Sequence, residues 1–262
     1  MPELPDLEVF KDNIYHKLTS KRLTGVNVYN RNKVITPLIM LTEELCGREL
    51  SAINRYGKEL YFDFGDSRII SAHLMLNGRI SIISNPEAAK SIKFKIFSLD
   101  FENESIVFSD YGGLLTIKYK PKPDPVPDAF GENFTLDYFR KIARRKASLN
   151  IKAFLIDQKV VKGIGNAYAD EILWHASISP HSKVGKIPEE VITKLYETIG
   201  NVLRAAIASI KEISPEIISG EERSFLKVHN KLLKQTETGF PITIEKIASK
   251  TTYYTKEQVF YG

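Results

Sequence analysis

Apolar residues near the start of the chain recur at the spacing of one helix face. They are Leu7, Phe10, Ile14 and Leu18. Because such a period places side chains on one stripe of a helix, it predicts an amphipathic helix over residues 3–19. Pro2 and Pro5 lie in its first turn, where a proline costs little because no intrahelical N–H donor is needed there.

From about residue 23 to residue 119 the pattern changes to short runs rich in β-branched and aromatic residues. Runs such as 69–74, 94–99 and 105–108 are bounded by Gly, Asn, Asp and Ser. Several short strands at this spacing predict an antiparallel sandwich or barrel.

Four prolines within residues 120–128 interrupt this pattern. A segment of that kind cannot form a helix or a central strand, and it favours a stiff, extended linker. We therefore predict a sandwich domain over 1–119 and a linker over 120–130. A helical domain over 131–232 and a β-hairpin over 233–262 follow.

The region after the linker has helical periodicity, and its tail returns to β-branched and aromatic residues. The predicted helices cover 136–143, 150–157, 167–176, 188–212 and 224–232. A turn at 239–241 precedes the runs 242–244 and 251–254, which predict a hairpin. The predicted fold class is α+β.

Composition and charge restrict the possible classes of function but do not decide among them. The 262 residues carry 37 Lys and Arg against 32 Asp and Glu, and the net charge of +5 leans moderately toward polyanionic partners. Cys46 is the sole cysteine, which excludes an internal disulfide and any cysteine-based zinc or iron–sulfur site. No apolar run approaches about 20 residues and no signal-peptide pattern is present, so we expect a cytoplasmic or nucleoid-associated protein.

Met1-Pro2-Glu3-Leu4-Pro5 is the most informative segment for chemistry. If Met1 is removed, Pro2 becomes a free secondary amine, and an α-amino group has a reference pKa of about 7.7–8.0. Such an amine can attack an aldehyde-like sugar carbon and form a Schiff base, with Glu3 beside it as an acid. The alternative without catalysis is that a proline at position 2 only marks efficient methionine removal.

The segment Gly163-Ile164-Gly165-Asn166 precedes a predicted helix. Glycines permit close backbone approach, and a helix N-terminus presents unpaired N–H groups to an anion such as a DNA phosphate. The alternative is a plain turn capped by Asn166. On charge alone, Lys152 and Lys162 are weaker candidates for phosphate contacts.

Four segments in order carry a resemblance to a known family. They are Pro2-Glu3-Leu4-Pro5, Arg55-Tyr56-Gly57-Lys58, His73-Leu74 through Asn77-Gly78-Arg79, and residues 158–174. Together they resemble the formamidopyrimidine-DNA glycosylase and endonuclease VIII family, and residues 158–174 resemble its helix–two-turn–helix motif. The resemblance covers almost the whole chain. It implies a monomeric, cofactor-free DNA glycosylase with lyase activity on damaged double-stranded DNA.

The resemblance also implies roles for individual residues. Pro2 is the nucleophile and Glu3 the acid or base, while Lys58 contacts the phosphate beside the damaged nucleotide. His73 lies along the DNA backbone track, although a buried strand histidine bonded to backbone is the alternative. Glu8 resembles a second motif glutamate, and Asp6 stands where many relatives have another; at least one can be only an N-terminal helix charge.

The tail departs from the family pattern of a four-cysteine zinc finger. The matching positions are Gln235, Thr238, Thr255 and Gln258, and none can replace a thiolate as a tight zinc ligand. The sequence therefore predicts no metal and a zincless finger held by packing of Phe240, Ile242, Tyr253 and Tyr254. Lys250 stands at the family's arginine position and can serve a phosphate only as a point charge.

The residues that would fill the gap left by an everted base also differ from the family pattern. Leu76 or Met75 can supply the first wedge. The family's arginine-bearing loop corresponds to residues 109–114, which contain no arginine. There Tyr111 could stack, or Gly112-Gly113 could simply form a tight turn. The missing arginine argues against a strict specialist for 8-oxoguanine opposite cytosine, so we expect oxidised pyrimidines, ring-opened purines or abasic sites.

A second class of function competes with the enzyme. A non-catalytic binder of bent, branched or abasic DNA would keep the fold and the charge. The joint presence of Pro2, Glu3 and Lys58 favours the enzyme, because an idle site has little physical reason to retain all three.

Overall fold

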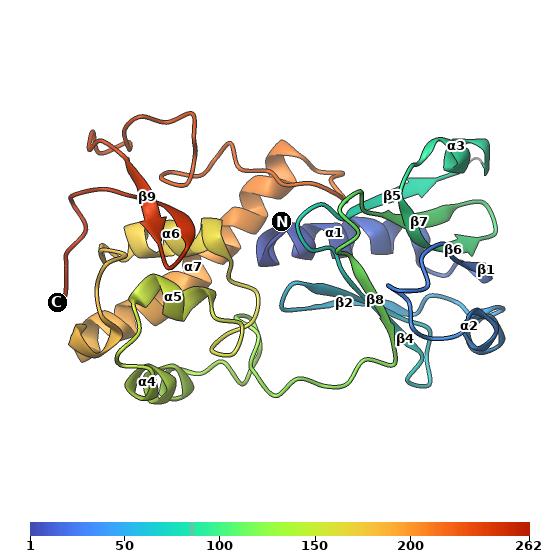
Figure 1. The fold of residues 1–262 in the computed structure, drawn as a ribbon, viewed down its shortest axis with the longest axis horizontal. Helices are drawn as coiled ribbons and strands as arrows, with labels where there is room; N and C mark the ends of the chain where they lie inside the picture. Colours follow the sequence, from blue (N-terminus) through green and yellow to red (C-terminus); the bar gives the residue numbers. More distant parts are fainter. Residues whose placement is uncertain (85) are drawn as a thin grey trace. The chain divides into compact units, whose positions relative to one another are not determined.

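The computed structural model describes residues 1–84 and 86–262 and divides into two compact units (Figure 1). The first unit contains Met1–Pro2, Asp6–Pro123 and Ser214–Glu221, and the second contains Glu3–Pro5, Asp124–Ile213 and Glu222–Gly262. The fold class is α+β, as predicted. Within the described residues, no helix combines the length and the apolar character needed to cross a membrane.

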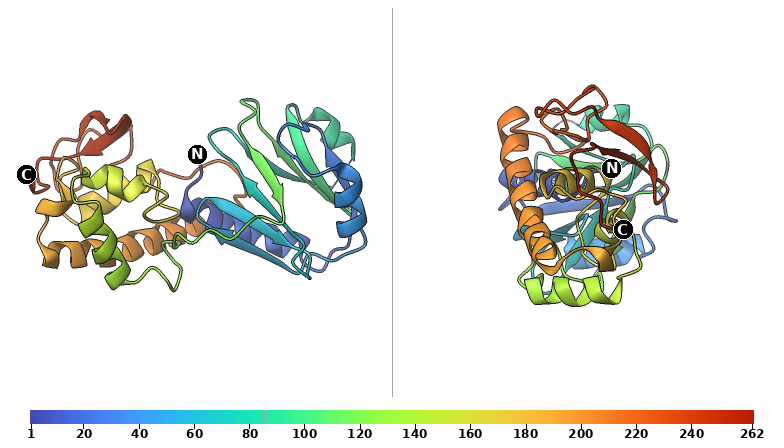
Figure 2. Two further views of the ribbon diagram at one scale, coloured as in Figure 1. Left: turned by 60° about the horizontal axis from the view of Figure 1, so that its bottom comes forward. Right: turned by 90° about the vertical axis from the view of Figure 1, so that its left-hand side faces the viewer.

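The first unit is built on two four-stranded antiparallel sheets, seen as separate layers in Figure 2. One sheet has the order β1-β6-β7-β5, with strands Leu23–Val28, Lys95–Phe101, Ser105–Ser109 and Arg79–Ile83. The other has the order β2-β3-β4-β8, with strands Ala52–Tyr56, Glu59–Asp63, Ile69–His73 and Thr116–Tyr119.

Helix α1, Leu4–Leu18, supplies an apolar stripe to the core of this unit. The four positions that predicted the helix are 0–1% exposed. Burying each such Leu, Ile or Phe side chain contributes about 1.5–3 kcal/mol. The stripe therefore anchors the N-terminal segment against the strands.

Two short helices interrupt the strand-like region and were not predicted. These are α2, Leu38–Leu45, and α3, Pro86–Ser91. In α2 the buried Leu41 and Leu45 are four residues apart on one helix face. A run this short gives too few repeats for the period to distinguish a helix from a strand.

The second unit is helical, with a separate core. Its helices are α4 (Leu136–Arg145), α5 (Ile151–Ile156), α6 (Asn166–His175) and α7 (Glu189–Ile213), with a 3₁₀ turn at Val184–Lys186. All four α-helices coincide with predicted ones. Helix α7 is identified by a long apolar period, which includes the buried Ile192, Leu195, Ile199 and Leu203.

The helix expected at 224–232 is wrong, because the segment forms a loop. The backbone N–H groups of Lys227, Val228 and His229 donate to the carboxylate of Glu171 at 3.0, 2.8 and 2.7 Å. Glu171 lies on α6 and is 2% exposed. A buried carboxylate thus takes the donors that a helix would have used.

The predicted hairpin is present as β9, Thr243–Ile247, and β10, Lys250–Tyr254. Ala248 and Ser249 join the strands and have φ values of +51° and +63°. Figure 2 shows the hairpin, in red, beside α6, in yellow, and the two elements are in contact.

Candidate active site

In the first unit, Pro2 lines a pocket of about 290 Å³. Leu76 and Tyr111, both candidates for entering the DNA stack, line the same pocket and are 61% and 72% exposed. Arg79 and Glu221 complete its charged lining. Two large exposed hydrophobic side chains in the wall of one pocket suit contact with a ligand.

The loop that carries Tyr111 is held by Asp110. Its carboxylate accepts the N–H groups of Gly112, Leu114 and Leu115 at 2.8, 2.6 and 2.7 Å. Gly113 has φ of +61°, in the left-handed region that favours glycine. The glycines therefore do form a tight turn, and this turn leaves Tyr111 exposed; the two sequence-based alternatives are compatible.

Leu76 follows a second constrained turn. Met75 has φ of +56°, and its N–H donates to His73 Nδ1 at 3.1 Å. A Cβ at Gly78 would lie 2.1 Å from the Leu74 carbonyl oxygen, so only glycine fits there. Met75 is half-buried while Leu76 is exposed, which makes Leu76 the better placed of the two wedge candidates.

Lys58 lies in the two-residue turn between β2 and β3 and is 8% exposed. Arg55 braces this turn by donating to the Gly57 carbonyl at 3.0 Å and to Glu8 at 2.7 Å. The Glu8 carboxylate also pairs with Lys11. Glu8 thus has a structural role in this unit, orienting the arginine behind Lys58.

His73 ends β4 and pairs across the sheet with Glu59. Burial lowers the pKa of His73, against the opposing effect of Glu59 and with a smaller contribution from Lys58. Because Nδ1 accepts the Met75 N–H, the neutral ring carries its proton on Nε2. A neutral imidazole of this tautomer can donate a hydrogen bond.

In the second unit, Glu3 caps the N-terminus of α6. Its carboxylate accepts the N–H groups of Gly165, Ala167 and Tyr168 at 2.8, 3.0 and 3.3 Å. The expectation that these three donors bind a DNA phosphate is therefore corrected, since the anion that they bind is Glu3 itself. A phosphate contact at this terminus is left to Asn166.

Both glycines of the 163–166 segment are explained by this docking. A Cβ at Gly165 would lie 2.3 Å from the Glu3 carboxyl carbon, and one at Gly163 would lie 2.7 Å from Leu4 Cδ1. Gly163 also has φ of +101°. The chain thus uses glycine to bring residues 3 and 4 against the turn before α6.

Asn166, on α6, is hydrogen-bonded to the hairpin strand β10 next to Lys250. Asn166 Nδ2 donates to the Thr251 carbonyl at 2.8 Å, while its Oδ1 is buried without a hydrogen-bond partner in the structure. Lys250, the residue before Thr251, is exposed. The backbone of β10 therefore fixes the position of Lys250 relative to the first turn of α6.

Lys152 is fully buried, which corrects its expected role as a phosphate contact. Its ammonium lies 2.7 Å from the Asp170 carboxylate and donates to Thr252 Oγ1 at 2.6 Å. Burial lowers the pKa of Lys152, and Asp170 opposes that effect. The other Asp170 oxygen lies 2.7 Å from His229 Nδ1. Lys162, the other weak candidate, pairs with Asp124 at 2.6 Å.

Two of the four positions matching the zinc ligands of the family, Thr255 and Gln258, are joined by a hydrogen bond. The Thr255 N–H donates to Gln258 Oε1, and Gln258 Nε2 donates to the Ile178 carbonyl, both at 2.8 Å. The described residues include no cluster of His, Cys, Asp and Glu suited to a metal. Phe240 is 42% exposed, so the expectation that it packs the finger is wrong. Tyr253 and Tyr254 do pack, against the rings of His229 and His181. The polar residues Thr252, Thr255 and Gln258 are buried as well.

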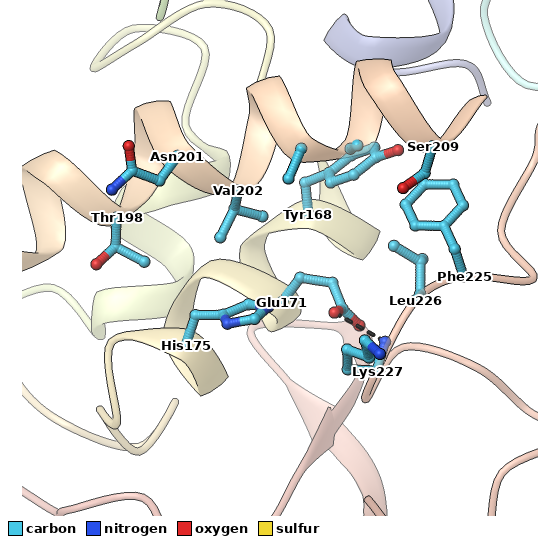
Figure 3. A pocket seen from close by; sticks show the side chains of 12 residues that line it. Tyr168, Glu171, His175, Thr198, Asn201, Val202, Ser209, Phe225, Leu226 and Lys227 are labelled. Atoms are coloured by element: carbon cyan, nitrogen blue, oxygen red, sulfur yellow. Dashed lines mark hydrogen bonds between the residues drawn. The ribbon is translucent and has the colours of Figure 1, made fainter. Parts of the chain in front are cut away.

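A separate pocket of about 560 Å³ lies between α6, α7 and the loop at 225–227 (Figure 3). Its walls include Tyr168, His175 and Asn201, and Glu171 reaches from it to the Lys227 backbone. None of the predicted site residues lines it.

Sequence reasoning missed Arg55, His229 and Glu221 as contributors to these arrangements. Arg55 and His229 act through partners 47 and 59 residues away, at Glu8 and Asp170. Only the acidic pair after Gly220 could have singled out Glu221, and acids in a loop are usually solvated.

Comparisons with known proteins agree with this geometry. Residues 1–116 match the model of the formamidopyrimidine-DNA glycosylase N-terminal domain, and residues 126–216 match the formamidopyrimidine-DNA glycosylase H2TH domain. The chain is 31% identical to the formamidopyrimidine-DNA glycosylase of Carboxydothermus hydrogenoformans over 88% of this chain and 89% of that protein. It is 28% identical to that of Lactococcus lactis subsp. cremoris over 97% of both.

Solved structures give the same result. The wild-type Lactococcus lactis Fpg in complex with DNA containing an oxidised pyrimidine superposes with a TM-score of 0.85 at 26% identity, over 97% of this chain and 98% of that one. A Lactococcus lactis Fpg complex with THF-DNA and an inhibitor also gives 0.85, at 25% identity and the same coverage.

Proposed function

Because the chain belongs to the formamidopyrimidine-DNA glycosylase family, we propose that it excises damaged bases from duplex DNA and then cleaves the strand. The observation that carries the proposal is the pocket that Pro2 shares with Leu76 and Tyr111. A nucleophile beside two exposed apolar side chains is the arrangement needed to attack a sugar whose base has been everted.

The proposed chemistry uses the amine of Pro2 after removal of Met1. Its lone pair forms a bond to C1′, and the bond from C1′ to the base breaks with its electrons going to the base. The nitrogen then gives up its remaining proton as the bond from C1′ to the ring oxygen breaks, and Glu3 delivers a proton to that oxygen, so the sugar ring opens. The resulting iminium then accepts the electron pair released when a C2′ proton is removed, and the C3′–oxygen bond breaks.

Phosphate contacts would position the sugar for this attack without reading the base. Lys58 and the neutral His73 supply them in the first unit, and Asn166 and Lys250 in the second. The buried Lys152 has no part in this set. Lys58 and Lys250 are point charges, so they provide affinity and register.

The preferred substrates are proposed to be oxidised pyrimidines, ring-opened purines and abasic sites. One support is that a relative of the same fold was solved with DNA containing an oxidised pyrimidine. The other is that the loop holding Tyr111 offers a stacking ring and contains no arginine to hydrogen-bond an opposite cytosine.

The decisive test is borohydride trapping on a duplex with one abasic site. The protein is first shown by intact mass to lack Met1. We expect a covalent adduct that is lost in Pro2→Gly. A matched control carries an uncleaved N-terminal extension before Met1, which leaves the fold intact but makes Pro2 a tertiary amide; it should bind the duplex and trap nothing.

The competing class predicts a different outcome. Tight, salt-sensitive binding of the abasic duplex without any adduct from the processed protein would make it a non-catalytic binder of distorted DNA. Activity on duplexes bearing an oxidised pyrimidine, a ring-opened purine or 8-oxoguanine would then rank the substrates of an active enzyme.

A further inference from the structure

The segment that follows α7 returns to the first unit and is fastened there. Asn13 Nδ2 donates to the Ile217 carbonyl at 2.9 Å, and the Ile80 N–H donates to Ser219 Oγ at 3.1 Å. Gly220 then turns with φ of +89°. These contacts place the next residue, Glu221, in the wall of the Pro2 pocket.

Glu221 already has an amine as its partner. With Met1 in place, the α-ammonium of Met1 pairs with the Glu221 carboxylate. Removing Met1 moves the terminal nitrogen by one residue, a step of no more than about 3.8 Å. The glutamate side chain is 36% exposed and has three rotatable torsions, so it can follow the new terminus.

We propose that Glu221 is the carboxylate partner of the Pro2 amine: it holds the amine as an ammonium ion in the resting protein and accepts its proton when the amine attacks. This role rests on the function proposed above. Glu3 is not the resting partner of the amine, because its carboxylate accepts three N–H groups of α6. Its proposed proton transfer belongs to the later step in which the sugar ring opens.

The proton balance is complete at an abasic aldehyde. The N–H bond of the Pro2 ammonium breaks and its proton goes to a Glu221 oxygen, while the freed lone pair forms the N–C1′ bond. The C1′–oxygen π pair goes to oxygen. Glu221 then returns the proton to that oxygen, which leaves as water together with the second amine proton, and the iminium remains.

The charges that line the pocket determine the sign of the expected pH effect. Glu221 stabilises the ammonium form, whereas the Arg79 guanidinium opposes it. Removing the carboxylate should therefore lower the pH at which the amine becomes neutral. For a partly exposed pair, the expected shift is roughly half a pH unit.

Two measurements on Glu221→Gln test the proposal, both with Met1 removed. The first follows the carbon chemical shifts of Pro2 against pH in protein labelled with ¹³C-proline, without DNA. The second follows the borohydride trapping rate against pH on the abasic duplex. We expect both midpoints to fall in Glu221→Gln and to stay near the wild-type value in Glu221→Asp.

Glu216→Gln is the matched control, because it removes the same charge from the same segment. Glu216 pairs with Lys17 and its side chain is 84% exposed, and the residue does not line the pocket. An unchanged Pro2 midpoint in Glu221→Gln would overturn the proposal. If Glu221→Gln fails to fold, Glu221→Ser removes the same charge and takes its place.

The two proposals fail in different ways. A wild-type protein that traps no adduct contradicts the glycosylase–lyase proposal, while the proline titration still reports on Glu221. A wild-type protein that traps the duplex, with the same pH profile in Glu221→Gln, contradicts the Glu221 proposal alone.

Discussion

At the scale of single residues, the docking of Glu3 onto α6 depends on the missing side chain of Gly165. Gly165 has φ of −122°, which any residue adopts, so an alanine there would strain the contact with Glu3 and not the backbone. We expect Gly165→Ala to cost about 1–3 kcal/mol, because it displaces a carboxylate that accepts three N–H groups. Thermal or urea unfolding would measure the loss.

A double-mutant cycle makes this prediction specific. With Glu3→Ala in place, the new methyl group at position 165 has no carboxylate to displace. The cost of Gly165→Ala should then shrink to a small fraction of its value in the wild-type background. Equal costs in the two backgrounds would show that Glu3 is not the partner that excludes a side chain.

His73 carries a prediction for the pH dependence of stability. Because burial lowers its folded-state pKa, the unfolded chain binds a proton first as the pH falls. The free energy of unfolding should therefore decrease below about pH 6.5, with a slope of at most about 1.4 kcal/mol per pH unit, until the folded-state pKa is reached. His73→Gln should lack this component. If the unfolding free energies of the wild type and His73→Gln, measured with urea, ran parallel between pH 7.5 and 5, the prediction would be refuted.

The sequence singled out the residues of the proposed chemistry but not their partners. Pro2, Lys58 and His73 could be singled out from short motifs. The capping role of Glu3 could not, since Gly165 is 162 positions away and only the folded chain brings the two together. The same holds for Lys152, whose charge suggested a phosphate until its burial against Asp170 was visible.

At the scale of elements, the buried Lys152–Asp170 pair joins α5 and α6 to the hairpin strand β10. Asp170 also accepts the Tyr253 N–H at 3.0 Å. We expect Asp170→Asn to destabilise the second unit by about 3–5 kcal/mol, because it leaves a buried ammonium without its counter-charge. Replacing both partners, as Lys152→Met with Asp170→Leu, should cost less than that single change.

A surface pair is the matched control for this prediction. Lys227 and Glu237 lie 2.8 Å apart with side chains 47% and 57% exposed. Glu237→Gln should therefore change the unfolding transition little, since exposed ion pairs contribute weakly. A double variant as unstable as Asp170→Asn would show that the cost lies in lost packing and not in the unpaired charge.

Elements were predictable where a long apolar period defined them. Helices α1 and α7 repeat their buried positions over several turns, and the hairpin strands are rich in β-branched and aromatic residues. The loop at 224–232 has helix-like spacing, but the Glu171 carboxylate outcompetes the helix for its N–H groups. Helix α2 offers only two buried leucines, too few for a period to appear.

At the scale of the whole molecule, the count of 37 lysines and arginines overstates the cations available to DNA. Lys162 is paired with Asp124, and Lys152 is buried with Asp170. The proposed phosphate contacts are instead a few fixed cations, Lys58 in one unit and Lys250 in the other. Affinity for DNA should therefore respond to particular lysines and not to the total charge.

The salt dependence of DNA binding measures this directly. Each phosphate contact adds about 0.9 to the slope of log affinity against log salt concentration, through counterion release. Lys250→Ala should lower the slope by about one and weaken binding to lesion-bearing and undamaged duplexes alike, because a phosphate contact carries no base information. Lys194→Ala, which removes an exposed charge from α7, should leave the slope unchanged. If both variants lowered the slope equally, the binding would depend on total charge and Lys250 would hold no special position on the DNA.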